Sequence, residues 1–257
     1  MKNMLFIMNP KAGRTTLKNS LVDVLEVFCN NDYAVRTYLT KSADDAERIV
    51  QEEGANYDVI VCAGGDGTLG NTVTGYMKSG IRVPLGYIPC GSTNDFARSM
   101  DIPRETVEAA EMIVKAEPFS IDIGSLNDKN FVYVAAFGMF SDTSYATPQN
   151  MKNIFGHAAY VLQGIKSLAN VPSYKMKVTI DGDEQEGEFI FGMVSNSVSV
   201  GGFKSITRKG VEFDDGLFEG VLIRTMKTPA DLERVVRALL TGCLLYTSPS
   251  PRDSTSS

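Results

Sequence analysis

The residues best suited to chemistry lie in the glycine-rich stretch VIVCAGGDGTLGN, at positions 59–71. Glycines directly after an apolar run let the backbone approach a polyanion without side-chain clashes. A helix that follows them presents free amide groups and its positive dipole end to that anion. Asp66 lies inside the loop, where it would repel a phosphate unless a divalent cation bridged the two. The stretch therefore predicts a phosphate site with Mg²⁺, and the alternative is a tight turn in which Asp66 only caps the helix.

Two further loops carry polar groups of the same kind. One is NPKAGR at 9–14, and the other is PCGSTNDFAR at 89–98. If the sheet is parallel, these loops meet at the carboxyl ends of the strands, where open α/β sheets bind ligands. Besides backbone amides, the pooled groups are Lys11, Arg14, Ser92, Thr93, Asp66 and Asp95. They suit phosphoryl transfer, which depends on positioning and charge neutralisation; for the two cations the alternative is ordinary solvated surface charge.

The elements that must position these loops alternate along the first half of the chain. Mainly apolar runs predict buried strands at 4–8, 58–63 and 84–88, and 34–39 is a further strand candidate. Helices are expected from Thr15, from Ser42 and after the loop at 64–68 to about Met77, with another starting after the fourth strand. Strand, loop and helix repeated in this order predict an α/β domain with a mostly parallel sheet over residues 1–120.

The second half has a different pattern. Apolar runs at 121–126 and 131–137 flank an Asn-Asp-Lys-Asn turn, and runs at 174–180 and 188–195 flank Asp-Gly-Asp. We therefore expect a β-rich, antiparallel second domain over 121–245. It would also hold a strand-like region at 211–224 and two helices, one at about 151–169 and one beginning at Thr228. Residues 246–257 are low-complexity Ser, Thr and Pro, which indicates a disordered tail or unrelated appended sequence.

Composition excludes several functional classes. The chain has 257 residues and a net charge of −6, which argues against a general nucleic-acid binder. Its four cysteines form no CxxC pair and His157 is the single histidine, so neither a zinc site nor a Ser-His-Asp triad is expected. The cysteine usage fits a reducing cytosol. The start MKNMLFIMNP is not expected to act as a signal peptide, and no apolar stretch approaches the ~20 residues of a membrane span. P-loop and protein-kinase motifs are also missing.

Three motifs together resemble a known family. NPKAG, GGDGT and PLGYIPCGSTNDFAR are similar to the corresponding motifs of the bacterial diacylglycerol kinase-like lipid kinases, and the resemblance covers about residues 1–245. It implies an ATP-binding α/β domain followed by a sandwich-like β domain where lipid enters. It also implies that Thr40 lies on the adenosine side and that Ser92 replaces the threonine of many members. The nucleotide-binding residues would be Asn9, Pro10, Lys11, Ala12, Gly13, Thr40, Gly64, Gly65, Asp66, Gly67, Thr68, Leu69, Gly70 and Ser92.

The resemblance also implies acidic and metal-binding positions. Asp66, Asp95 and Asp122 match a magnesium-linked network, in which the first two would support catalysis. Asp215 resembles the aspartate of a second, structural Mg²⁺ site completed near Glu212 and Leu217, whereas the residues alone favour an ordinary β-turn at 214–216. Gly201-Gly202 resembles a glycine pair of the second domain.

The function expected from this resemblance is an ATP- and Mg²⁺-dependent lipid kinase that phosphorylates a hydroxyl such as that of diacylglycerol and feeds phospholipid metabolism. It would be cytoplasmic, with peripheral contact at the inner membrane face, and a homodimer is compatible with the family. The family's acidic general base lies in a further C-terminal stretch, so we expect this sequence to be truncated. Whether the chain as given is active is left undecided by the resemblance. An NAD kinase, which shares GGDGT, and a non-catalytic nucleotide-binding protein are the alternatives.

Overall fold

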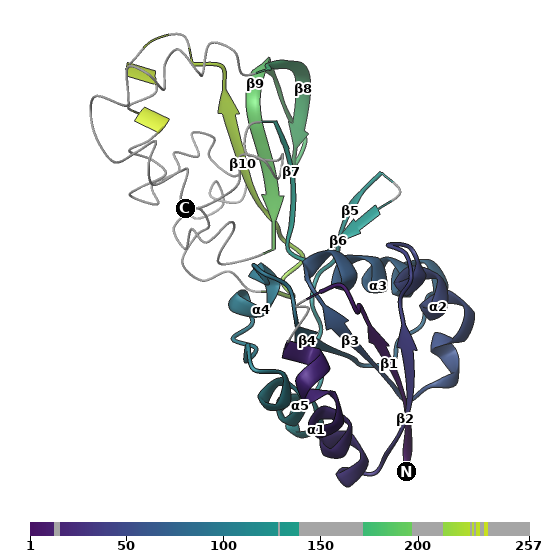
Figure 1. Cartoon of the computed structure of the whole chain (residues 1–257). Helices are drawn as coiled ribbons and strands as arrows, with labels where there is room; N and C mark the ends of the chain where they lie inside the picture. The colour runs from purple at the N-terminus through teal and green to yellow at the C-terminus, as the bar shows by residue number, and fades with distance from the viewer. Residues whose placement is uncertain are drawn as a thin grey trace, which may run out of the picture. The chain divides into compact units, whose positions relative to one another are not determined.

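The structure, a computed structural model, describes residues 1–12, 16–127, 129–138, 172–196, 213–226, 228, 230–231 and 234–235. The chain divides into two compact units (Figure 1). The first comprises Met1–Ala135, Ser195–Ser199 and Glu212–Phe218, and the second comprises Ala136–Val194, Val200–Val211 and Glu219–Ser257. The first unit therefore extends past residue 120. The domain boundary that the sequence predicts at residue 120 stays a prediction.

The first unit is built on the expected parallel sheet. Its strands are β1 (Lys2–Met8), β2 (Tyr33–Leu39), β3 (Val59–Gly64) and β4 (Leu85–Pro89). They run in the order β2-β1-β3-β4, and every neighbouring pair is parallel. All six residues of β3 are buried, which is why its sequence is a continuous apolar run without a polar face.

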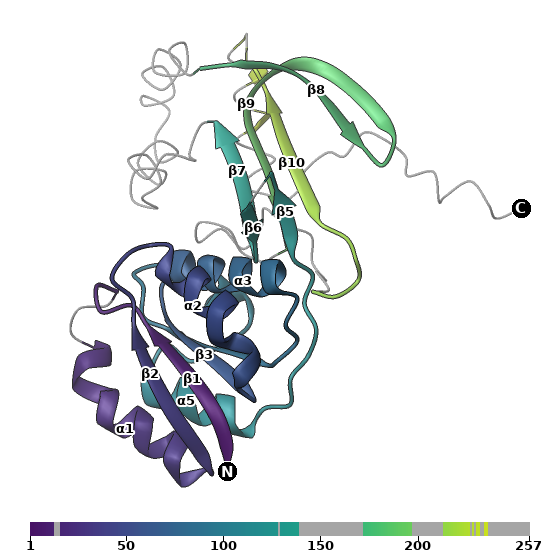
Figure 2. The same ribbon diagram turned by 90° about the vertical axis from the view of Figure 1, so that its right-hand side faces the viewer.

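Helices cover both faces of this sheet (Figure 1, Figure 2). Helices α1 (Thr16–Asn30) and α5 (Thr106–Lys115) pack on one face, and α2 (Asp45–Glu53) and α3 (Asp66–Ser79) pack on the other. Successive strand residues point to opposite faces, so neighbours within β1 enter different clusters. Met4, Phe6 and Met8 pack with α1 and α5, whereas Leu5 and Ile7 pack with α2.

Three helical details differ from the sequence-based expectation. Helix α2 begins at Asp45 rather than at Ser42, because the Asp45 carboxylate accepts the amides of Lys41 and Ser42 and holds those residues in a turn. A short 3₁₀ helix, η1 (Gly54–Asn56), follows α2. Helix α5 was not expected at all, although Glu105 caps it by accepting the Val107 amide at 2.9 Å.

The end of the first unit carries a short antiparallel hairpin. Strands β5 (Gly124–Leu126) and β6 (Lys129–Phe131) form the expected hairpin, but the partner of 124–126 is 129–131 rather than 131–137, so residues 129 and 130 belong to the strand and not to the turn. A Cβ on Gly124 would lie 2.0 Å from the Phe131 ring, so only glycine fits opposite this aromatic side chain. The hairpin packs against α3.

A separate antiparallel sheet holds most of the remaining described strands. It contains β7 (Val134–Gly138), β8 (Tyr174–Ile180), β9 (Asp183–Ser195) and β10 (Glu219–Arg224). The order is β10-β9-β7, with β8 paired to β9. Asp181 and Gly182 join β8 to β9 with φ of 50° and 94°, the geometry that an Asp-Gly hairpin turn requires. The β-rich, antiparallel second region is thus confirmed, and its sandwich-like arrangement stays a prediction.

Several expectations fall on residues outside those the structure describes. They concern Gly13, Arg14, His157, Glu212, the Gly201-Gly202 pair, the helix at 151–169 and the tail at 246–257. At the predicted helix start, the Thr228 amide donates to Asp231 Oδ2 at 2.9 Å and Thr228 Oγ1 accepts from the Asp231 amide at 3.2 Å. This reciprocal pair is a capping box. None of the helices in the described ranges combines the length and apolar character needed to cross a bilayer.

The buried cysteines of the sheet should resist alkylation. Burial raises the pKa of the Cys62 thiol to about 12 and that of Cys90 to about 11, whereas Cys29 is exposed. Because the thiolate is the reactive form, iodoacetamide at pH 8 should modify Cys29 at least tenfold faster than the two buried thiols. Peptide mass spectrometry before and after denaturation measures this difference. Native Cys62 labelled as fast as Cys29 would contradict the packing of β3.

Candidate functional site

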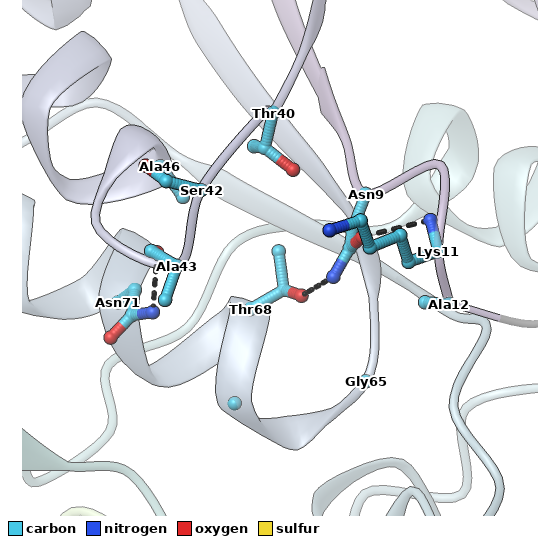
Figure 3. A pocket seen from close by; sticks show the side chains of 11 residues that line it. Asn9, Lys11, Ala12, Thr40, Ser42, Ala43, Ala46, Gly65, Thr68 and Asn71 are labelled. Carbon is cyan, nitrogen blue, oxygen red and sulfur yellow. Dashed lines mark hydrogen bonds between the residues drawn. The ribbon is translucent and has the colours of Figure 1, made fainter.

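A pocket opens at the carboxyl ends of β1, β2 and β3. The chain leaves β1 toward β2 on one side and returns to β3 on the other, so the strand order reverses between β1 and β3. This is the position at which open α/β sheets bind ligands. The pocket has a volume of about 380 Å³, within the range of small-molecule sites (Figure 3). Its lining residues are Asn9, Lys11, Ala12, Thr40, Ser42, Ala43, Ala46, Gly65, Gly67, Thr68 and Asn71.

Asn9 joins the loop after β1 to the first turn of α3. Its side-chain Nδ2 donates to Thr68 Oγ1 at 3.0 Å, and its Oδ1 accepts the Lys11 amide at 3.0 Å. Its backbone amide donates to the Ala63 carbonyl at 2.9 Å. One side chain therefore fixes two of the three loops that the sequence predicted to converge, and Figure 3 shows both of its side-chain bonds beside Lys11.

The amino end of α3 faces the pocket. Gly65 is the N-cap residue in extended conformation, and no side chain caps the helix. The Gly65 carbonyl accepts the Thr68 and Leu69 amides. A Cβ on Gly67 would meet no atom within 4 Å, so the backbone there borders open space. An anion could therefore approach the first amides of α3 directly.

Two other glycines are required by close packing rather than by ligand access. A Cβ on Gly64 would lie 2.5 Å from Thr68 Oγ1, and one on Gly91 would lie 2.7 Å from Gly65 Cα. The turn after β3 and the turn after β4 are thus in backbone contact. Asn94 braces the second turn, since its Oδ1 accepts the Gly91 amide and its Nδ2 donates to the Gly91 carbonyl, both at 2.8 Å.

The Asp66 carboxylate does not cap its own helix. Its Oδ2 accepts the Asp95 amide at 3.2 Å and its Oδ1 accepts the Phe96 amide at 3.3 Å, at the start of α4 (Asp95–Ser99). Asp95 itself is only 5% exposed, and its carboxylate lies 3.8 Å from the Arg98 guanidinium. The Asp66 carboxylate is therefore held by the backbone of a helix that begins 29 residues further along the sequence.

Asp122 lies in a different set of contacts. Its Oδ2 accepts the Gly216 amide at 2.6 Å, and its own amide donates to the Phe213 carbonyl at 2.7 Å. Asp215 Oδ1 accepts the Leu217 amide at 2.9 Å, and Gly216 has a φ of 74°, so residues 214–217 form a hydrogen-bonded turn. The metal site expected at Asp215 and Leu217 stays a prediction, because its third residue lies outside the described ranges.

Asn196 is a site residue that the sequence analysis missed. It is 1% exposed, and its Nδ2 donates to the carbonyls of both Asp122 and Phe213 at 3.1 Å. Its backbone amide donates to the Tyr133 carbonyl at 2.9 Å. Three segments distant in sequence are thus joined by the side-chain and backbone amides of one buried residue. The only local signal was an asparagine directly after a predicted strand.

The acidic residues fit a magnesium ion held partly by substrate, not a complete protein cage. Within the described ranges, no three His, Cys, Asp or Glu side chains form a metal site by themselves. Magnesium is commonly held by one or two carboxylates together with phosphate oxygens and water. Asp66, the first residue of α3, and Asp95, the first residue of α4, are carboxylates of the kind that such a site uses, whereas the Asp122 carboxylate bonds the Gly216 amide.

The structure places the predicted nucleotide-binding residues in two groups. Those that line the pocket are Asn9, Lys11, Ala12, Thr40, Gly65, Gly67 and Thr68. Those that do not line it are Pro10, Gly64, Asp66, Leu69, Gly70 and Ser92. Leu69 belongs to the core, where it packs with Val73 and Phe96, and Ser92 is exposed on its loop.

Four lining residues were missed, and one of them had a local signal. They are Ser42, Ala43, Ala46 and Asn71. Asn71 follows Gly67 by one helical turn, so helical spacing puts both on the same face of α3. Its Nδ2 donates to the Ala43 carbonyl at 2.7 Å and connects α3 to the loop before α2 (Figure 3).

Comparisons with known proteins agree on one family. A model of the diacylglycerol kinase catalytic domain matches residues 3–126. A diacylglycerol kinase of Bacillus subtilis (strain 168) is 34% identical over 244 residues, covering 94% of this chain and 80% of that protein. One from Staphylococcus aureus (strain JH9) is 33% identical over 226 residues, covering 86% and 70%. The crystal structure of a diacylglycerol kinase from Bacillus anthracis str. Sterne superposes with a TM-score of 0.73 at 25% identity, covering 98% of this chain and 82% of that one.

Proposed function

This chain belongs to the diacylglycerol kinase family of lipid kinases, and we propose that it transfers the γ-phosphate of Mg²⁺-bound ATP to a lipid hydroxyl such as that of diacylglycerol. The observation that carries the proposal is the pocket at the reversal of strand order, which opens onto the uncapped amino end of α3. A polyphosphate suits such a position because free amides and the helix dipole both favour negative charge.

Nucleotide binding is assigned to residues that border this pocket. The amides of the first turn of α3 would bind phosphate oxygens beside Gly67, and the Lys11 ammonium would neutralise part of their charge. Thr40, only 7% exposed, borders the pocket where the chain leaves β2. The sugar and base would extend from α3 toward Thr40 and Asn71, as the family resemblance implies for Thr40.

Two carboxylates, those of Asp66 and Asp95, are assigned to the metal ion. Asp66 and Asp95 would hold Mg²⁺ together with the phosphates, and the ion when bound would neutralise charge on the transferring group. The hydrogen bonds from the Asp95 and Phe96 amides fix the Asp66 carboxylate, so it needs little reorganisation to accept the ion. The Asp122 carboxylate accepts the Gly216 amide and is not assigned to the metal ion. No described residue is assigned as the base that takes the proton from the lipid hydroxyl.

The acceptor determines where the enzyme works. A diacylglycerol is held in a bilayer by its acyl chains, so the protein would act while docked at the inner face of the cytoplasmic membrane. Homodimerisation stays a prediction from the family resemblance. The diacylglycerol kinases reported above favour the lipid kinase over the NAD kinase alternative, and no described feature favours a non-catalytic protein.

The direct test is phosphate transfer in vesicles. We expect the protein to transfer label from [γ-³²P]ATP to diacylglycerol in the presence of Mg²⁺, and not to NAD. ATP binding without transfer to diacylglycerol, phosphatidylglycerol, undecaprenol or a sphingoid base would contradict the proposal and favour a regulatory nucleotide-binding protein. Transfer to NAD alone would favour the NAD kinase.

Replacing Thr68 by valine should weaken ATP binding selectively. The substitution keeps the shape of a side chain that is 8% exposed but removes the hydroxyl that accepts from Asn9. A single hydrogen bond contributes about 1 kcal/mol, so KM for ATP should rise about fivefold with little change in kcat. Thr74→Val is the matched control, because its hydroxyl bonds only the Gly70 carbonyl within α3. Equal effects of both variants on KM would show that helix stability, not the pocket, was measured.

A further inference from the structure

A second, smaller pocket lies next to the first. It has a volume of about 190 Å³ and borders the same turn of α3, since Gly67 lines both pockets. Its lining residues are Asp66, Gly67, Gly70, Asn130, Phe131, Val132, Tyr133 and Val134. The first turn of α3 therefore has the proposed nucleotide pocket on one side and a mostly apolar pocket on the other. A carboxylate that belongs to the proposed phosphate-transfer site, Asp66, borders the second one directly.

Tyr133 is fixed in this pocket from two directions. Its carbonyl accepts the amide of Asn196 at 2.9 Å, and the adjoining Val132 is 4% exposed in the core under α3. The Tyr133 ring packs against the same core cluster, which includes Leu69 and Phe96. Its position is thus set by packing and by a backbone hydrogen bond, neither of which involves its hydroxyl group.

The Tyr133 hydroxyl is available to bind a ligand. No described residue forms a hydrogen bond with this hydroxyl, and Tyr133 is only half-buried, so the group is accessible to a ligand in the pocket. Burial, and then the negative charges of Asp66 and Asp95, raise the pKa of Tyr133. The phenol is therefore neutral throughout the physiological range and carries a proton to donate. A donor beside an apolar wall and next to the phosphate-transfer carboxylates suits an uncharged ligand with acceptor oxygens.

We infer that Tyr133 binds the headgroup of the lipid alcohol in this second pocket, donating a hydrogen bond to an oxygen of the acceptor and so directing its hydroxyl toward the amino end of α3. The inference rests on the proposed function and adds the residue that orients the acceptor. An ester-bearing alcohol such as a diacylglycerol offers oxygens next to the reacting hydroxyl, and Phe131, Val132 and Val134 offer apolar contacts for the first carbons of its chains. Tyr133 binds and orients; it does not move the reacting proton.

The test compares Tyr133→Phe with Tyr76→Phe. Both changes remove one hydroxyl from a largely buried ring, but the Tyr76 hydroxyl donates to the Pro84 carbonyl at 3.4 Å and lines neither pocket. With dioctanoylglycerol in mixed micelles, Tyr133→Phe should lower kcat/KM for the lipid about tenfold and leave KM for ATP unchanged. Tyr76→Phe should change neither parameter. A Tyr133→Phe variant with wild-type kcat/KM for the lipid, or with an equal rise in KM for ATP, overturns the inference.

A binding measurement separates this inference from the proposed function. The protein labelled with 3-fluorotyrosine has 10 tyrosines, and the line absent from Tyr133→Phe assigns Tyr133 in its ¹⁹F spectrum. Adding dioctanoylglycerol together with a non-hydrolysable ATP analogue should shift that line and leave the Tyr76 line in place. A Tyr133 line that does not move overturns the inference even if the wild-type protein phosphorylates the lipid. A line that moves in a protein without phosphate transfer supports the headgroup site and contradicts only the kinase assignment.

Discussion

Replacing Asp66 with asparagine should reduce kcat for lipid phosphorylation by about 10³-fold while leaving the protein folded. The amide keeps the shape of the side chain and one oxygen, so it can still accept one of the two amides at the start of α4. It loses the negative charge that we propose binds Mg²⁺ beside the phosphates. The reaction should also require a higher Mg²⁺ concentration for half-maximal rate, because one of the two proposed carboxylate ligands is missing.

The control for Asp66→Asn is Asp58→Asn, which changes a carboxylate that accepts a backbone amide far from the pockets. Asp58 Oδ2 accepts the Asn3 amide at 2.7 Å before the first residue of β3, at the end of the sheet opposite the pockets. Asp58→Asn should lower the free energy of unfolding by about 1–2 kcal/mol and leave kcat and the Mg²⁺ requirement unchanged. Urea denaturation and initial rates over a magnesium series measure both quantities. If Asp66→Asn kept full turnover and an unchanged magnesium requirement, the metal assignment would be wrong.

Replacing Gly91 with alanine should lower stability and kcat/KM for ATP, although Gly91 is not assigned to ligand binding. The new methyl group would lie 2.7 Å from Gly65 Cα and 2.6 Å from Asn94 Oδ1, and the first of these is backbone that cannot rotate away. The turn after β4 must therefore move off the turn after β3, and the Asp66 bonds to Asp95 and Phe96 must lengthen. We expect a loss of about 1–3 kcal/mol in the free energy of unfolding and a fall in kcat/KM for ATP of about 10²-fold.

A glycine outside the site provides the comparison for Gly91. A Cβ on Gly220, in β10, would meet no atom within 4 Å, so Gly220→Ala should leave both stability and kinetics near those of the wild type. Calorimetry and ATP titration of the two variants measure the difference. A Gly91→Ala variant with unchanged ATP kinetics would show that backbone contact between the two turns does not position the phosphate site.

Much of the first unit could be predicted because its signals are local. The central strands β1 and β3 are buried over most of their length and have short apolar runs in their sequences. In a parallel sheet the loops that follow the strands lie at the same edge, so their convergence could also be predicted. The Asp-Gly turn before β9 needs positive φ at both positions, which few other residue pairs tolerate. Helix α5 was missed, although its signals were also local. They are the capping residue Glu105 and the apolar positions 109, 110 and 113.

The contacts that complete the site could not be predicted, because they join residues remote in sequence. Asp66 was identified as functional, but only the folded chain shows that its carboxylate accepts amides from α4, about 30 positions away. Tyr133 had no distinguishing local pattern in its apolar run. It becomes a candidate because the fold places it in the second pocket beside Asp66.

The sequence by itself thus determined the parallel α/β sheet, the phosphate-type loops and their convergence on one edge, because periodicity, glycine placement and strand direction act over a few residues. Only the tertiary structure decided which backbone amides hold the Asp66 carboxylate and which residues border the second pocket. Asn196 meets the Asp122 carbonyl across 74 residues of sequence. Such contacts form only after the chain has closed long loops, and their free energy depends on the packing that results. A short stretch of sequence therefore does not predict them.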